Sequence, residues 1–263
     1  MSNIMLFMSA DIAGSAEFKQ VAPITDARAT WLSSFETFFR EFPLVVMGQI
    51  ALTFADVDSL PSIKIWKVIG DELVFRAPIA TPDEALRLTE AFYRAVVKYD
   101  QKFFSRWPLR IRGTCWACDL SSRNIEIEIP EMDNDQGSYT DYLGPDVDAG
   151  FRIAKKGENG NLIISMELAE LLAKIKENRG LRFHYVGKTA LKGVFAGQPY
   201  PLIFTSFEGV EPDLWRWDLE ESEQLRSLRD DPPISPESLS ELIEKIRTYL
   251  NRKSRLGLSP LEP

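Results

Sequence analysis

The sequence contains a single histidine, His184, and only two cysteines, Cys115 and Cys118, among 263 residues. One histidine excludes zinc sites that need several histidine ligands. A Ser-His-Asp triad would have to use His184, which lies in the apolar stretch LRFHYVG, a pattern typical of a strand. The CxxC pair lies in another strand-like stretch, RIRGTCWACDL, without a second pair nearby. We therefore interpret all three as ordinary strand residues.

An excess of positive charge and a long apolar run are also missing. Thirty-one Lys and Arg residues stand against thirty-nine Asp and Glu residues, which gives a net charge of −8 and argues against a nucleic-acid-binding protein. No apolar run approaches the ~18 residues of a transmembrane helix, and the first residues do not resemble a secretory signal. Two cysteines cannot make a disulfide scaffold. These absences predict a cytoplasmic protein that binds neither nucleic acid nor a membrane.

The spacing of apolar residues predicts an α+β fold with a mixed sheet. The order β-α-β-β-α-β, followed by further elements, predicts a ferredoxin-like arrangement with helices packed on one face. A Gly-Asp turn joins the second and third strands as a hairpin. We expect strands at 4–12, 62–69, 72–77, 109–120, 124–129, 161–165, 183–191 and 200–207, and helices at 25–41, 82–104, 146–156 and 166–177.

The character of the sequence changes after Phe207. The next residues are acidic and interrupted by prolines, and residues 235–253 then show the pattern of a capped amphipathic helix. We therefore expect a main domain over residues 1–207 and a C-terminal helical appendage over residues 208–263. The appendage would pack on the domain or on a partner.

Two aspartates occupy informative places at strand ends. Asp11 lies at the C-terminal end of the first strand, and Asp71 lies at the tip of the predicted hairpin. The first strand and this hairpin are natural neighbours in such a sheet, so the two carboxylates can share divalent metal ions, as in two-metal phosphoryl-transfer sites. The turn at Gly14 and Ser15 would also offer backbone N–H groups to a phosphate. Either aspartate alone is more often a turn or capping residue, so the pair carries the inference.

Four motifs in order resemble the catalytic domain of the class III nucleotidyl cyclases. They are FMSADIAGS, KVIGDELVF, DYLGPDVDAGFRIA and ALKGV, and they cover about residues 4–207. The resemblance implies that Asp11 and Asp71 bind two divalent metal ions, Mn²⁺ or Mg²⁺, with the backbone carbonyl of Ile12 as a further ligand. It also implies the ferredoxin-like fold of that family.

The same resemblance assigns roles toward a nucleoside triphosphate. Lys67 and Asp141 would bind the base. Arg152 would stabilise charge on the α-phosphate, and Lys192 would hold the β- and γ-phosphates. The implied reaction is attack of the ribose 3′-hydroxyl on the α-phosphate with loss of pyrophosphate. In that family the site is shared across a two-fold homodimer: metal residues come from one chain, and the base and transition-state residues come from the other.

Two positions depart from the family pattern. Asp148 stands where the family usually has an Asn that orients the ribose. This carboxylate would accept a sugar hydroxyl or pair with Arg152 one helical turn away. Ala117 stands where some members have a further triphosphate-binding Arg. Fewer residues would therefore bind the triphosphate, or another residue such as Arg112 would take the place of that Arg.

Hydrogen bonding alone leaves the base open. In the family a Lys–Asp pair marks adenine and a Glu–Cys pair marks guanine, so Lys67 and Asp141 argue against GTP. A lysine can donate to adenine N1, cytosine N3 or uracil O4, and an aspartate can accept from an exocyclic amine or from uracil N3–H. ATP, CTP and UTP all remain compatible. Exclusion of purines would have to come from the size of the pocket.

Further details resemble the stand-alone bacterial pyrimidine cyclases of the Pycsar anti-phage system. These details are MSADIAGSAEFK, the motif that contains Asp148, and AGQPYPLIFTSFE. The resemblance implies that UTP is converted to cyclic UMP, which a separate effector protein reads; CTP and cyclic CMP are the alternative. A conventional adenylate cyclase, an inactive nucleotide-binding module and a ferredoxin-like interaction protein remain as competing hypotheses. The retained metal and phosphate residues argue against the inactive module.

Overall fold

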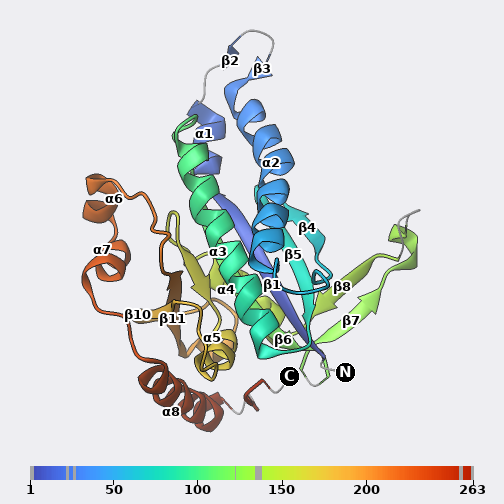
Figure 1. Cartoon of the computed structure of the whole chain (residues 1–263), viewed down its shortest axis with the longest axis vertical. Coiled ribbons are helices and arrows are strands. Elements are labelled where there is room, and N and C mark those ends of the chain that lie inside the picture. Colours follow the sequence, from blue (N-terminus) through green and yellow to red (C-terminus); the bar gives the residue numbers. More distant parts are fainter. Residues whose placement is uncertain are drawn as a thin grey trace.

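A seven-stranded mixed sheet forms the centre of the computed structural model, which describes residues 3–21, 24–25, 28–121, 123–133, 138–254 and 257–261 (Figure 1). Its strand order is β10-β11-β9-β6-β1-β5-β4. All neighbours are antiparallel except β6 and β9, which confirms the predicted α+β class. The strands of this sheet are β1 (Ile4–Ala13), β4 (Lys64–Ile69), β5 (Glu72–Ile79), β6 (Arg110–Asp119), β9 (Leu162–Ile164), β10 (Leu181–Ala190) and β11 (Pro199–Phe207).

The helices lie on both faces of the sheet, so the expectation of helices on one face is wrong. Figure 1 shows α2 and α3 lying over one face. On the opposite face, Val147 and Phe151 of α4 pack against Phe7 and Trp116. The reason is that β1 carries apolar side chains on both of its faces, and each face needs a cover. The helices are α1 (Ser15–Val21), α2 (Thr30–Thr53), α3 (Pro82–Phe104), α4 (Pro145–Ala154), α5 (Met166–Ala173), α6 (Arg216–Glu221), α7 (Glu223–Asp230) and α8 (Pro236–Ser254).

Helix α2 starts later and ends later than the helix predicted at 25–41. The predicted first residue, Thr25, lies in the short strand β2 (Ile24–Thr25), which pairs with β3 (Arg28–Ala29), and Asp26 lies outside the described residues. The helix continues through Pro43, although proline removes a helical hydrogen bond. Phe42 beside it is fully buried, so tertiary packing outweighs the local cost. Neither α2 nor any other helix of the described ranges is long and apolar enough to cross a membrane.

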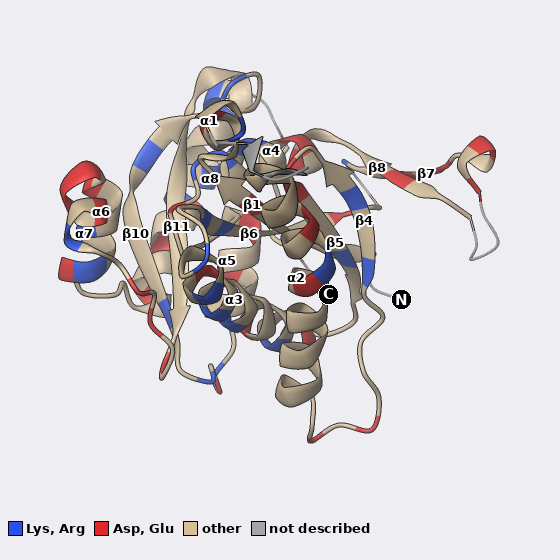
Figure 2. Cartoon of the chain, turned by 90° about the horizontal axis from the view of Figure 1, so that it is seen from above, with Lys and Arg blue, Asp and Glu red and all other residues tan. Residues whose placement is uncertain are grey.

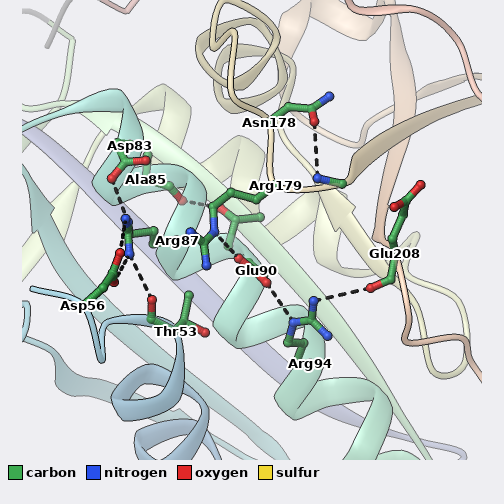
Figure 3. Close-up of polar contacts among 12 residues, drawn as sticks. Thr53, Asp56, Asp83, Ala85, Arg87, Glu90, Arg94, Asn178, Arg179 and Glu208 are labelled. Atoms are coloured by element: carbon green, nitrogen blue, oxygen red, sulfur yellow. Dashed lines mark hydrogen bonds and ion pairs between the residues drawn. The ribbon is translucent and has the colours of Figure 1, made fainter.

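A polar network along α3 ties this helix to distant segments (Figure 3). Arg87 donates to Asp56, which follows α2. Glu90 is buried and accepts from Arg94 of the same helix and from Arg179 in the turn before β10. Two guanidinium partners compensate the cost of burying this carboxylate. The network therefore belongs to the scaffold.

The C-terminal segment packs on the rest of the chain. Helix α8 lies beside α5 (Figure 1), and its Leu239, Ile243 and Leu250 join the same hydrophobic core as the sheet. Arg247 of α8 also forms a buried ion pair with Glu170 of α5. The division into a main domain over residues 1–207 and a C-terminal appendage over residues 208–263 stays a proposal.

Strands β7 (Ile125–Glu128) and β8 (Thr140–Leu143) pair with each other and not with the main sheet. Figure 2 shows them as an arm that projects from the body, with acidic residues toward its tip. The sequence predicted the first of these strands but not its partner. Part of the loop between them, residues 134–137, lies outside the described residues. The arm matters for the site because β8 carries Asp141.

Candidate active site

The end of β1 and the tip of the β4–β5 hairpin bring Asp11 and Asp71 to the same edge of the sheet. In the antiparallel pairing of β1 with β5, Asp11 lies opposite Glu72. The N–H of Ile12 donates to the carbonyl of Asp71 at 3.4 Å. The hydroxyl of Ser15 donates to the Asp71 carboxylate. The two aspartates therefore lie together as the sequence predicted; their role as metal ligands stays a prediction.

The turn after Asp11 is built by Gly14 and Ser15. Gly14 has a φ of 76°, in the left-handed region that glycine adopts without strain. Ser15 begins α1, and its hydroxyl is already committed to Asp71. The Ile12 side chain is buried in the core, so only its backbone is available to a ligand.

Arg112 contacts Asp11 directly, a pairing that the sequence did not reveal. The two residues lie opposite each other on β6 and β1, and Nη2 of Arg112 donates to Oδ2 of Asp11 at 2.5 Å. Burial raises the pKa of the Asp11 carboxyl, while the positive charges of Arg112 and Lys155 oppose that rise and the negative charge of Asp71 adds to it. The two aspartates are thus within electrostatic reach of each other.

A third carboxylate, Glu72, lies next to this pair and was missed at the sequence level. It is 2% exposed, accepts from the hydroxyl of Ser9, and pairs with Lys155 at 3.4 Å. The available signal was an acidic residue directly before the apolar run LVF of the predicted strand. Because Lys155 caps the C-terminus of α4, this pair connects α4 to the edge that carries Asp11.

The donor set suits a hard divalent cation. Within the described ranges, no three His, Cys, Asp or Glu side chains gather into a complete metal cage. Mg²⁺ is commonly held by one or two carboxylates together with substrate phosphates. Asp11, Asp71 and the Ile12 carbonyl offer oxygen ligands of that kind, so they fit Mg²⁺ or Mn²⁺.

Lys67 and Asp141 form an ion pair, with 2.7 Å between Nζ and Oδ1. Their side chains are 26% and 18% exposed, so solvent and ligands can reach them. A bulge in β4 between Ile65 and Lys67 interrupts the strand register, and bulges commonly redirect side chains. The structure thus joins the two residues that the resemblance named as base ligands; binding of a base stays a prediction.

Asp148 and Arg152 lie one turn apart on α4, and both are exposed. No ion pair joins them in the described part of the chain, so the structure does not contain the pairing considered from the sequence. Gly150 lies between them against the ring of Trp116, and a Cβ there would fall 2.3 Å from ring atoms. This close approach seats α4 on the sheet.

We expect Gly150→Ala to destabilise the protein by about 1–3 kcal/mol, because the added methyl group overpacks the contact with Trp116. Gly48→Ala is the matched control, since a Cβ at Gly48 on α2 meets no atom within 4 Å. That change should stabilise the helix by about 0.5–1 kcal/mol. Urea unfolding of both variants measures the difference, and equal stabilities would contradict the proposed packing constraint.

Lys192 lies at the other end of the sheet from Asp11. The strand pairings make β10 run in the same direction as β6. Across the sheet, Phe183 near the start of β10 is in register with Gly113 of β6, which pairs with the residue before Asp11 on β1. Lys192 follows the far end of β10, in an exposed turn with Gly193. Within one chain, Lys192 therefore cannot join the Asp11 site.

The residues set aside at the sequence level are structural. His184 lies on β10, with Nε2 3.1 Å from the Ser206 hydroxyl. Cys115 and Cys118 are buried free thiols on β6, and burial raises the pKa of both, which confirms their ordinary strand role. Ala117 is 2% exposed, so its position belongs to the core.

A cavity of about 450 Å³ lies away from the predicted site residues, between β10, β11 and the C-terminal segment. Its lining includes His184, Ser206 and Leu228 but none of the predicted site residues. A site that needs a second chain for completion would not form an enclosed cavity in one chain. The position of this cavity therefore does not count against the site at Asp11.

Comparison with solved structures finds nucleotidyl cyclase domains. The adenylyl cyclase CyaB from P. aeruginosa is similar with a TM-score of 0.56 at 16% identity, over 82% of this chain and 97% of that chain. The guanylate cyclase domain of RhGC from Catenaria anguillulae, in complex with GTP, gives a TM-score of 0.55 at 13% identity, over 78% and 97%. No family model matches the sequence, and no curated protein does. Nearly the whole length of each cyclase domain is thus matched, and the chain has the fold of the class III nucleotidyl cyclases.

Proposed function

We propose that this protein is a nucleotidyl cyclase, which forms a 3′,5′-cyclic nucleotide and pyrophosphate from a nucleoside triphosphate. The observation that carries the proposal is the adjacency of Asp11 and Asp71 on a cyclase fold. A fold alone supports many functions. A paired carboxylate site at a strand end adds the chemistry that phosphoryl transfer needs.

Asp11, Asp71 and the Ile12 carbonyl would hold the two divalent cations, Mn²⁺ or Mg²⁺. When bound, such cations favour ionisation of the 3′-hydroxyl and neutralise charge on the triphosphate. The turn at Gly14 and Ser15 would donate backbone N–H groups to a phosphate.

The remaining residues would position the substrate and stabilise charge. Arg152 would donate to the α-phosphoryl oxygens as negative charge moves onto them. Asp148 would accept a ribose hydroxyl, since no partner on the protein competes for it in the described part of the chain. Lys192 would bind the β- and γ-phosphates from the second chain of a two-fold homodimer. Its distance from Asp11 within one chain supports this composite site.

We propose UTP as the preferred substrate, with CTP as runner-up and ATP as a poor substrate; a conventional adenylate cyclase is the alternative hypothesis. Lys67 would donate to uracil O4, and Asp141 would accept from uracil N3–H. The aromatic rings behind this pair are bulky: Trp66 lies 4.8 Å from Phe7 and 5.3 Å from Tyr142, measured between ring centroids. Trp66 is our candidate for the side chain that occupies the volume of the missing imidazole ring. Cyclic UMP would then act as an anti-phage signal for a separate effector protein.

The test is kcat/KM for all four nucleoside triphosphates with Mn²⁺, with mass detection of the cyclic products. We expect UTP to exceed ATP by about 10²-fold, because a purine displaced by ~1 Å loses that much rate. Trp66→Ala should lower the ratio of kcat/KM for UTP to kcat/KM for ATP, because the enlarged pocket would admit the larger base. A preference for ATP would overturn the pyrimidine proposal and leave a cyclase. No turnover with any of the four would favour a binding module.

A further inference from the structure

The contact between Arg112 and Asp11 places a fixed positive charge on a proposed metal ligand. The Arg112 side chain is 25% exposed and that of Asp11 is 8% exposed, so water screens the pair poorly. Gly157 lies close to the base of the Arg112 side chain, since a Cβ at Gly157 would fall 3.3 Å from the Arg112 Cβ. Its Nε is buried without a hydrogen-bond partner. The guanidinium thus has one strong partner and unused donor capacity.

A cation on Asp11 and the guanidinium of Arg112 compete for the negative charge of one carboxylate. The guanidinium donates to Oδ2 at 2.5 Å, so a metal ion bound through both carboxylate oxygens would meet it there. Two positive charges on one carboxylate also repel each other where water is scarce. Occupation of Asp11 by a metal ion therefore favours movement of Arg112 away from this carboxylate.

We propose that Arg112 couples metal binding to triphosphate binding, by pairing with Asp11 in the metal-free protein and with a phosphate once metal has released it. This inference rests on the proposed function. A guanidinium presents a planar set of donors that matches phosphate oxygens. After release it lies beside the Asp11–Asp71 edge with no carboxylate partner. Arg112 thus weakens metal binding when nucleotide is absent and strengthens nucleotide binding when metal is present.

Thermodynamic linkage makes the two effects reciprocal. If metal frees Arg112 for the phosphates, then metal raises nucleotide affinity by the same factor by which nucleotide raises metal affinity. The protein would then bind free metal ions weakly and bind the metal–nucleotide complex more tightly than either ligand alone. Arg112 binds the triphosphate directly in this scheme.

Lys155 provides the matched control. It is another cation near Asp11, and its charge also opposes the rise in the pKa of that carboxyl. Its direct partner is Glu72, at 3.4 Å, and its side chain is 59% exposed. Its removal changes the local charge equally but frees no oxygen of Asp11.

The experiment measures Mn²⁺ binding from the electron paramagnetic resonance signal of free Mn²⁺, without nucleotide. Wild type, Arg112→Met, Lys155→Met and Asp11→Asn are compared at pH 8. We expect Arg112→Met to bind Mn²⁺ about tenfold more tightly, within the usual range of coupling energies. Lys155→Met should change affinity by less than about threefold, as expected for a solvent-screened charge. Asp11→Asn should weaken binding.

A second titration measures a non-hydrolysable UTP analogue with and without Mn²⁺. The gain in analogue affinity from Mn²⁺ should be about tenfold smaller in Arg112→Met than in wild type. Arg112→Gln replaces the Met variant if thermal unfolding shows that the latter does not fold. Unchanged or weaker Mn²⁺ binding in the folded Arg112 variants would overturn the coupling alone. Unchanged Mn²⁺ binding in Asp11→Asn would overturn the proposed metal site and the coupling together.

Discussion

Asp11→Ala and Asp71→Ala should each lower turnover by about 10³-fold in saturating Mn²⁺. Loss of about 4 kcal/mol of transition-state stabilisation has this effect on rate, and a bound metal ion contributes several kcal/mol of such stabilisation. Asp71 lies partly exposed in the hairpin turn, where its loss removes one hydrogen bond from Ser15. Asp11 is buried near the end of β1, where its loss removes the ion pair with Arg112. Each loss removes polar contacts at a strand end and leaves the apolar core of the sheet intact, so we expect the fold to survive.

The measurement is cyclic product formation by mass detection, together with thermal unfolding of each variant. Asp58→Ala is the matched control, because Asp58 is an exposed aspartate in the segment after α2. It should retain wild-type activity. Near-normal turnover of either site variant in Mn²⁺ would show that the two carboxylates do not hold the catalytic metal ions.

Mixing Asp71→Ala chains with Arg152→Ala chains should restore activity that neither variant shows alone. If each site takes its metal ligands from one chain and Arg152 from the other, one site of the mixed dimer contains both lesions. The other site is intact. Half of randomly mixed dimers are mixed and carry one working site of two, so we expect about a quarter of wild-type activity.

Mixing Asp11→Ala with Asp71→Ala chains is the matched control. These two residues belong to the same half of the site, so each site of that mixed dimer carries one lesion and should stay inactive. Co-purification through two different tags verifies that mixed dimers form in both experiments. Restoration in the control mixture, or its absence in the test mixture, would mean that the division of residues between chains is wrong.

The sequence by itself determined the strands of the main sheet in their order along the chain and the places of the two aspartates at strand ends, but it did not predict α1 or β8. A continuous apolar run marks β1, alternation of apolar residues marks β5, and the Gly70-Asp71 turn marks the hairpin between β4 and β5. These signals are local, since each depends on a few consecutive residues. The helix at 82–104 was predicted correctly for the same reason, because Pro82 marks its start.

Only the tertiary structure decided which of these residues meet. The ion pair of Arg112 with Asp11 depends on the register between β1 and β6, and that of Lys67 with Asp141 depends on an arm outside the main sheet. Pro43 stays inside α2 because of packing that no local signal reports. Pairings between segments far apart in the chain are set by the burial of whole faces and not by residue propensity, so the sequence supplied the chemical groups while the packed sheet placed them next to each other.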